Sequence, residues 1–134
     1  MSQTSGQYLG FEEKCWKLTQ KDKVRFAGII DEFGKLIAGG FKDGLAPLEK
    51  DKKKLEEFIK FVSDISQRKT LDDSLGPINY LAARRDKVIL LSFPFPLSGL
   101  TLLISADSSL YIESMAEYVV HVFDTEQARF IDGT

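Results

Sequence analysis

The residues of this sequence that are most capable of chemistry lack the partners that catalysis requires. His121 is the only histidine, and a histidine general base needs a nucleophile to activate and a group that orients its ring. The sequence shows neither. Cys15 is the only cysteine, and it falls on the apolar side of a helical pattern, which favours a buried thiol over a reactive one. We therefore predict no catalytic residue, and we expect that the chain is not an enzyme.

Metal and cofactor sites are not predicted either. Asp72 and Asp73 are neighbouring carboxylates, but no further ligands accompany them in the sequence. A single cysteine excludes a cysteine-based zinc site and an intramolecular disulfide, and it fits a reducing compartment such as the cytoplasm. The glycine-rich phosphate-binding motifs are missing from the sequence, and Gly39-Gly40 alone forms no phosphate cradle.

Two clusters of basic residues leave two interpretations open. The first cluster opens a predicted helix beside two acidic residues, and it consists of Lys50, Lys52, Lys53 and Lys54. The second cluster follows Tyr80 and consists of Arg84, Arg85 and Lys87. The first can bind phosphate or an acidic partner and the second nucleic acid, or each can be a solvated charged surface. The formal net charge of −2 favours the solvated surface, so no nucleic-acid partner is predicted.

Length and composition predict one globular domain. The chain has 134 residues, of which 43% are hydrophobic and 28% are charged. Its longest apolar run, Val88 to Leu91, is far shorter than the roughly 20 residues that span a bilayer, and no membrane insertion is predicted. The N-terminus does not have the pattern of a signal peptide. We expect a cytoplasmic domain over residues 8–123, between a disordered segment 1–7 and a tail 124–134.

A β-hairpin over residues 24–41 is the centre of the predicted fold. Val24 to Asp31 alternates with the period of a strand. Asp31 to Gly34 has turn chemistry, because aspartate accepts backbone hydrogen bonds and glycine tolerates positive φ. Lys35 to Phe41 continues as the second strand, where Gly39-Gly40 predicts a bulge or the close approach of another backbone.

Three helices are predicted from apolar residues that recur at steps of three and four. The first begins at Tyr8 and the second covers residues 48–69. The third is expected to begin at an N-cap formed by Ser108 or Ser109. The buried sides of the last two helices are predicted to be Leu55, Phe58, Ile59, Val62 and Ile65, and then Ile112, Met115, Ala116, Val119 and Phe123.

Three further strands are predicted over residues 78–84, 87–93 and 100–106, with Pro94 and Pro96 interrupting the last hairpin. The last two strands are apolar on both faces, so we expect them to be central and covered on both sides. The predicted order is therefore α-β-β-α-β-β-β-α. It favours an α/β (α+β) fold with a single five-stranded antiparallel sheet and helices on both faces.

This element order, together with the hairpin sequence DEFGKLIAGG, resembles the roadblock family of dynein-light-chain-related proteins in the profilin-like and longin-like group. The hairpin is similar to the family's Asp-x-x-Gly-x-x-Ile-Ala pattern, and the resemblance covers roughly residues 8–123. The Pro94-Phe95-Pro96 insert departs from the family pattern. The run RRDKVILLSFPF is also similar to an uncharacterised archaeal protein family.

The resemblance implies a non-enzymatic homodimer that acts as a scaffold or a small-GTPase regulator. Roadblock proteins join their sheets edge to edge, with their long helices side by side. Carried over to this sequence, the dimer surface would consist of the strand 78–84 and one side of the second helix, with the residues Phe58, Phe61, Val62, Ile78, Tyr80, Ala82 and Arg84.

An alternative hypothesis is a PAS-like small-ligand sensor. Related sheets with flanking helices hold ligands in a pocket between the sheet and a helix. The aromatic side chains expected to line such a pocket are Tyr80, Phe93, Phe95 and Trp16.

Overall fold

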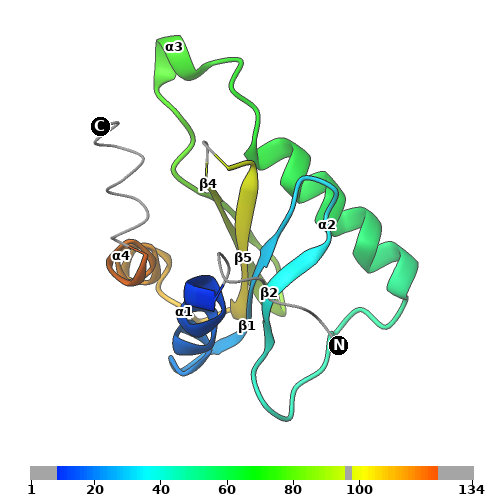
Figure 1. Cartoon of the computed structure of the whole chain (residues 1–134). Coiled ribbons are helices and arrows are strands. Elements are labelled where there is room, and N and C mark those ends of the chain that lie inside the picture. The colour runs from blue at the N-terminus through cyan, green and yellow to red at the C-terminus, as the bar shows by residue number, and fades with distance from the viewer. Residues whose placement is uncertain (1–8, 96–97, 124–134) are drawn as a thin grey trace.

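The computed structural model describes residues 9–95 and 98–123, and it contains one five-stranded antiparallel sheet with the strand order β2-β1-β5-β4-β3. The helices α1 and α4 cover one face of the sheet, and α2 lies on the other (Figure 1). These observations confirm the predicted fold class. The predicted segments 1–7 and 124–134, and Pro96, lie outside the described residues.

The strands are β1 (Val24–Ile30), β2 (Leu36–Phe41), β3 (Leu81–Arg84), β4 (Val88–Phe95) and β5 (Leu100–Asp107). The helices are α1 (Leu9–Thr19), α2 (Lys52–Ser66), α3 (Asp72–Leu75) and α4 (Ile112–Val122).

The hairpin of β1 and β2 forms as predicted. Asp31 Oδ1 accepts hydrogen bonds from the backbone N–H groups of Phe33 and Lys35, and Gly34 has a φ of 83°. The side chain of Asp31 thus closes the turn that its sequence position predicts. The close approach predicted at the glycine pair is confirmed at Gly39, where an added Cβ would lie 2.2 Å from the carbonyl oxygen of Ala27.

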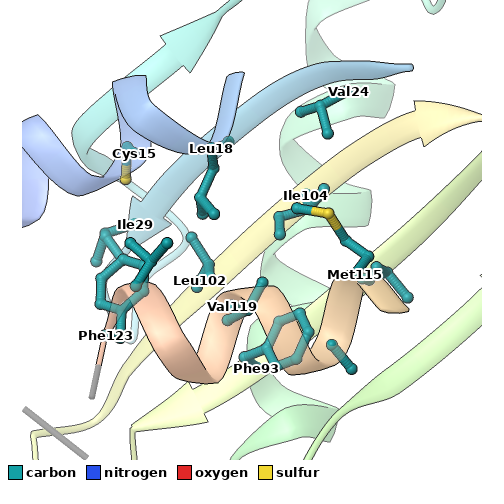
Figure 2. Packing of buried hydrophobic residues seen from close by; sticks show 14 of the residues in the cluster. Cys15, Leu18, Val24, Ile29, Phe93, Leu102, Ile104, Met115, Val119 and Phe123 are labelled. Atoms are coloured by element: carbon teal, nitrogen blue, oxygen red, sulfur yellow. The ribbon is translucent and has the colours of Figure 1, made fainter. Parts of the chain in front are cut away.

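The main core lies between the sheet and the pair α1 and α4. Cys15 and Leu18 of α1 point towards Ile29 of β1 and Leu102 of β5, and Phe123 lies beside them at the end of α4 (Figure 2). All five side chains are fully buried. The predicted stripe of the last helix is confirmed, because its central residues Met115, Ala116 and Val119 are buried in the same cluster.

The prediction that Pro94 and Phe95 interrupt the last hairpin is wrong. Both residues belong to β4, where Pro94 pairs with Thr101 and Phe95 pairs with Leu100 of β5. Strand β3 pairs with β4 only as far as Ser92. Pro94 therefore lies where β4 has a neighbour on one side only, and such a position tolerates a residue without a backbone N–H.

Three predicted boundaries are also corrected. Helix α2 is shorter than residues 48–69, because the carboxylate of Asp51 accepts hydrogen bonds from the N–H groups of Lys53 and Lys54 and so begins the helix at Lys52. No serine caps α4. Its N-cap is Tyr111, and Ser109 donates to the carboxylate of Asp107 instead. Strand β3 begins at Leu81, so residues 78–80 precede it.

Candidate interaction surfaces

The two residues considered first for chemistry do not form a catalytic arrangement. Cys15 is buried under α1, and this burial raises the pKa of its thiol to about 12. The thiol therefore stays protonated and unreactive at neutral pH. His121 is exposed in the last turn of α4. The predicted core position of Cys15 is confirmed.

The search for a metal site gives no candidate among the described residues. No group of three or more histidine, cysteine or acidic side chains is placed to hold an ion within residues 9–95 and 98–123. Asp72 and Asp73 lie in the single turn of α3. Within the same part of the chain, no helix has the length and apolar character needed to cross a membrane.

The two edges of the sheet differ in how they are covered. At the β2 edge, α1 packs against the strand, and the Glu12 carboxylate accepts a hydrogen bond of 3.1 Å from the backbone N–H of Gly39. The ammonium group of Lys42 donates to the carbonyl oxygen of Lys21 at the same edge. Helix α1 thus covers part of the β2 edge, and it satisfies a backbone donor that no strand pairs.

Within residues 9–95 and 98–123, the β3 edge has no such cover. Among the described strands, β3 pairs with β4 alone, and its other side carries no strand. The side chains of Ala82, Ala83 and Arg84 are exposed. A strand with one unpaired edge is a template on which another chain can add a strand.

The three predicted interface residues of α2 differ in exposure. Phe61 is 58% exposed, and Phe58 and Val62 are half-buried. Helix α2 packs on β4 and β5, which leaves the outer part of its apolar side without a partner in the described chain. A 58% exposed phenylalanine is an apolar anchor that a second molecule can cover.

The other predicted interface residues lie in different settings. Tyr80 precedes β3, its ring contacts that of Phe93, and its hydroxyl donates to the carboxylate of Glu113 on α4. This hydrogen bond raises the pKa of Tyr80. The guanidinium group of Arg84 donates to the carbonyl oxygen of Ser108. Ile78 is half-buried ahead of the strand. Tyr80 and Arg84 are therefore engaged within the chain, whereas Phe61 and Ala82 are available.

The four aromatic residues proposed for a ligand pocket do not line a common cavity. Phe95 is fully buried and stacks on Phe11, and Phe93 is buried beside Tyr80. Trp16 lies at the surface of α1, where its indole N–H donates to Glu12. A small-ligand sensor therefore has no pocket built from these residues.

A large groove lies on the opposite face of the sheet, between the N-terminal half of α2 and the strands. Its volume is about 1140 Å³. Aromatic and aliphatic side chains of the sheet form its floor, and α2 with the preceding loop forms its wall. The main apolar residues that line it are Phe26, Ile30, Leu36, Phe41, Leu48, Leu55, Phe58, Ile59, Val88, Leu90 and Leu103.

The rim of this groove brings the two basic clusters together. Lys52 and Lys54 of the first cluster line the groove with Arg84, Arg85 and Lys87 of the second. The two clusters are about 30 residues apart in sequence, so the sequence pattern alone leaves them separate. Only the position of the β3–β4 turn relative to the start of α2 makes them one surface.

Comparison with solved structures shows which fold this is. A roadblock/LC7 domain from Streptomyces avermitilis has a TM-score of 0.62 at 11% identity, with 90% of this chain and 97% of that chain covered. MglB from Myxococcus xanthus has a TM-score of 0.66 at 12% identity, with 98% and 95% covered. The gliding protein MglB from Thermus thermophilus has a TM-score of 0.63 at 12% identity, with 93% and 96% covered. These similarities confirm the roadblock-like fold.

Sequence comparison assigns the family. A search among curated proteins gives no match. The sequence model of one family, described as a family of unknown function, matches residues 7–133, which is nearly the whole chain. This chain therefore belongs to the family of unknown function DUF6659.

Proposed function

We propose that this protein is a non-enzymatic, homodimeric interaction module of the cytoplasm, which acts as a roadblock-like scaffold or as a regulator of a small GTPase. The observation that carries the proposal is the open β3 edge in a roadblock-like fold. Roadblock proteins, which the sequence resembles, join their sheets at such an edge. The cytoplasmic location is supported by the single, buried and protonated Cys15 thiol.

The proposed dimer joins two β3 strands and brings the two α2 helices side by side. The exposed Ala82 on β3 offers no bulk that would keep a second strand away. The 58% exposed Phe61 would be covered by the α2 helix of the second copy. A solved MglB structure with a tetrameric arrangement shares the fold, which supports self-association as a property that this fold allows.

A scaffold or GTPase-regulating role is supported by what the fold provides. The described residues offer surfaces rather than a catalytic site, since Cys15 is buried and His121 is exposed in the last turn of α4. Structural neighbours with the same fold include MglB and MglC, whose similarity to this chain lies in the fold alone. Roadblock proteins bind small GTPases, motor complexes or membrane-associated scaffolds.

Sedimentation velocity at micromolar concentration tests the dimer. The wild-type chain is expected to sediment as a dimer, and Phe61→Glu is expected to sediment as a monomer because two carboxylates would be placed in an apolar contact. Val120→Glu is the matched control, since Val120 is a 51% exposed apolar residue of α4, which covers the other face of the sheet. A monomeric wild type, or a dimer that survives Phe61→Glu, would contradict the proposed interface.

Affinity capture from the native cell extract tests the partner class. The immobilised full-length chain is incubated with extract in the presence of GDP or of a non-hydrolysable GTP analogue. A regulator is expected to retain a small GTPase in one nucleotide state and to release it in the other. Equal retention in both states, or retention of no GTPase, would remove the regulator role and leave the scaffold.

A further inference from the structure

We propose that the groove between α2 and the sheet is a docking site for an acidic amphipathic segment of a partner protein. The occupant is a stretch of chain with apolar side chains on one face and aspartate or glutamate on its flanks. This inference names the chemistry of a partner, and it rests on the proposed function only in assuming that the chain binds other proteins. The groove is built from one protomer, so the docking site does not require the dimer.

The groove exists because α2 is hydrogen-bonded to the sheet at its C-terminal end and not along its N-terminal half. Hydrogen bonds tie its C-terminal end to the strands and their turns: Ser63 donates to the carbonyl oxygen of Asp31, Ser66 bonds Ser92, and Gln67 donates to the carbonyl oxygen of Leu100. Within the described chain, no hydrogen bond joins residues 52–60 of the helix to the strands. The N-terminal half of α2 therefore forms a wall beside the sheet rather than a lid on it.

The floor of the groove is apolar and recessed. Phe26 and Phe41 lie on neighbouring strands with their ring centroids 4.8 Å apart, and Leu103 continues the floor on β5. Leu48 stands at the margin with 53% of its side chain exposed. Leu36 in the same groove is 44% exposed, whereas Phe26 and Leu103 are already buried. An inserted segment would therefore remove the apolar surface of the two exposed leucines from water.

The charge at the rim favours an acidic occupant. Six basic and three acidic residues line the groove, a local excess of three positive charges on a chain whose formal net charge is −2. Lys52, Lys54, Arg85 and Lys87 are exposed, and none of the four forms an ion pair with a described residue. Cations that the described residues leave without an ion pair are complementary to carboxylates of a partner.

The size and shape of the groove favour a peptide segment over the other occupants. A volume of about 1140 Å³ exceeds the usual range of small-molecule pockets, roughly 300–1,000 Å³. A membrane surface contacts protruding apolar residues, whereas on this floor Phe26 is buried and Phe41 is half-buried. An amphipathic helix laid into an apolar groove satisfies both features, with its apolar side chains on the floor and its acidic flanks at the rim.

Binding of defined peptides to the purified full-length chain tests the proposal. Three fluorescein-labelled peptides of about 18 residues are compared by fluorescence anisotropy. The first consists of leucine and glutamate, with the leucines at helical spacing. The second has the same composition in scrambled order, and the third keeps the helical pattern with lysine in place of glutamate. The patterned leucine–glutamate peptide is expected to bind at least about tenfold more tightly than the other two. Equal binding of the patterned and scrambled peptides would overturn the proposal.

Charge-reversal variants place the binding in the groove. Arg85→Glu combined with Lys87→Glu is expected to lower the affinity for the patterned peptide by about tenfold or more. Leu48→Glu is expected to lower this affinity as well. The control, Lys17→Glu combined with Arg68→Glu, changes the net charge equally at exposed positions outside the groove. It is expected to change the affinity by less than about twofold. Equal loss in the two double variants would show non-specific attraction and overturn the docking site.

Two further measurements exclude the competing occupants. The first is binding to phosphatidylserine vesicles. If the vesicles bind the wild-type chain but not the variant with Arg85→Glu and Lys87→Glu, the occupant of the groove is a membrane surface and not a peptide. Loss of the dimer in the Leu48→Glu variant, whose position lines the groove but lies outside β3, would make a second copy the occupant. If the chain is monomeric but binds the peptide, only the dimer fails. If it is dimeric and binds no peptide, only the docking site fails.

Discussion

The two faces of the sheet contain similar strand residues, but they are covered to different degrees. On one face α1 and α4 bury Ile29 and Leu102 completely (Figure 2), and Phe95 is fully buried in the same cluster. On the other face α2 is the only covering helix of the described chain, and a groove of about 1140 Å³ separates its first half from the strands. The apolar pattern of a strand predicts which residues need cover, but it does not predict how closely the covering helix approaches.

This difference assigns separate tasks to the two faces. A close-packed core resists any change in side-chain volume, so the face under α1 and α4 supports the stability of the fold. A face with an apolar floor and a charged rim has contacts still to make, so the face under α2 supports binding. Measurements on single side chains can therefore test whether the division is real.

The largest expected effect is the loss of Phe95 from the closed face. Its ring is fully buried and contacts the rings of Phe11 and Phe123. Phe95→Ala is expected to lower the free energy of unfolding by about 3–5 kcal/mol, because it leaves a cavity that the neighbouring rings cannot fill. Urea denaturation followed by Trp16 fluorescence measures the change. Phe33→Ala, at a 72% exposed turn position, is the control and is expected to stay within about 0.5 kcal/mol of wild type.

Two neighbouring leucines of β5 compare the faces directly. Leu102 is in the closed core, whereas Leu103 points to the other face and lines the groove. Leu102→Ala is expected to cost about 3–4 kcal/mol. Leu103 is also buried, with 5% of its surface exposed, but it borders the groove, so Leu103→Ala is expected to cost less, about 2 kcal/mol. The same denaturation experiment measures both. Equal costs would mean that α2 closes over Leu103 in solution and that the groove is not open.

The buried thiol of Cys15 gives the closed face a dependence on alkaline pH. The pKa of the thiol is about 12 in the folded chain, raised chiefly by burial, against 9.0 in the absence of the fold. As the pH rises above 9.0, the unfolded chain loses the thiol proton while the folded chain keeps it. The thiol's contribution to stability is therefore constant below about pH 9 and decreases by up to about 1.4 kcal/mol per pH unit between about 9 and 12.

The Cys15→Ala variant isolates this effect from the other groups that titrate in the same range. The difference in unfolding free energy between wild type and variant is expected to be level from about pH 7 to about pH 9 and to shrink or change sign above it. The measurement is a set of urea denaturations across that range. A difference that does not depend on pH up to about 10.5 would show that the Cys15 thiol is accessible to water.

The strands and their order along the chain were predictable because they follow from local residue patterns. Asp31 and Gly34 define the first turn, and the apolar residues on both sides of β4 and β5 require cover on both faces. The prediction for Pro94 is wrong because its tolerance depends on where β3 stops pairing, at Ser92, and the sequence contains no sign of that register. The failed serine cap of α4 has a similar cause, because Ser109 bonds Asp107 rather than the helix.

The candidate surfaces were predictable only in part. Phe61 is placed at the dimer surface by the family resemblance, and its side chain is 58% exposed. Tyr80 was placed at the dimer surface by its position near β3, but a hydroxyl contact with Glu113 turns it to α4. The groove is not predictable from the sequence, because its rim joins Lys52 and Arg85, which tertiary structure alone brings together.

The smallest expected effect tests the hydrogen bond between Ser66 and Ser92, which attaches α2 to the face of the sheet with the groove. Ser66 and Ser92 are buried, and their hydroxyl oxygens lie 2.7 Å apart. Ser66→Ala is expected to lower the free energy of unfolding by about 1–2 kcal/mol, because the hydroxyl of Ser92 loses its partner in a buried setting. The double variant with Ser92→Ala is expected to cost less than the sum of the two single variants, since it removes both hydroxyls together. Additive costs would show that the two hydroxyls do not bond each other, and α2 would then be held by Ser63, Gln67 and apolar contact alone.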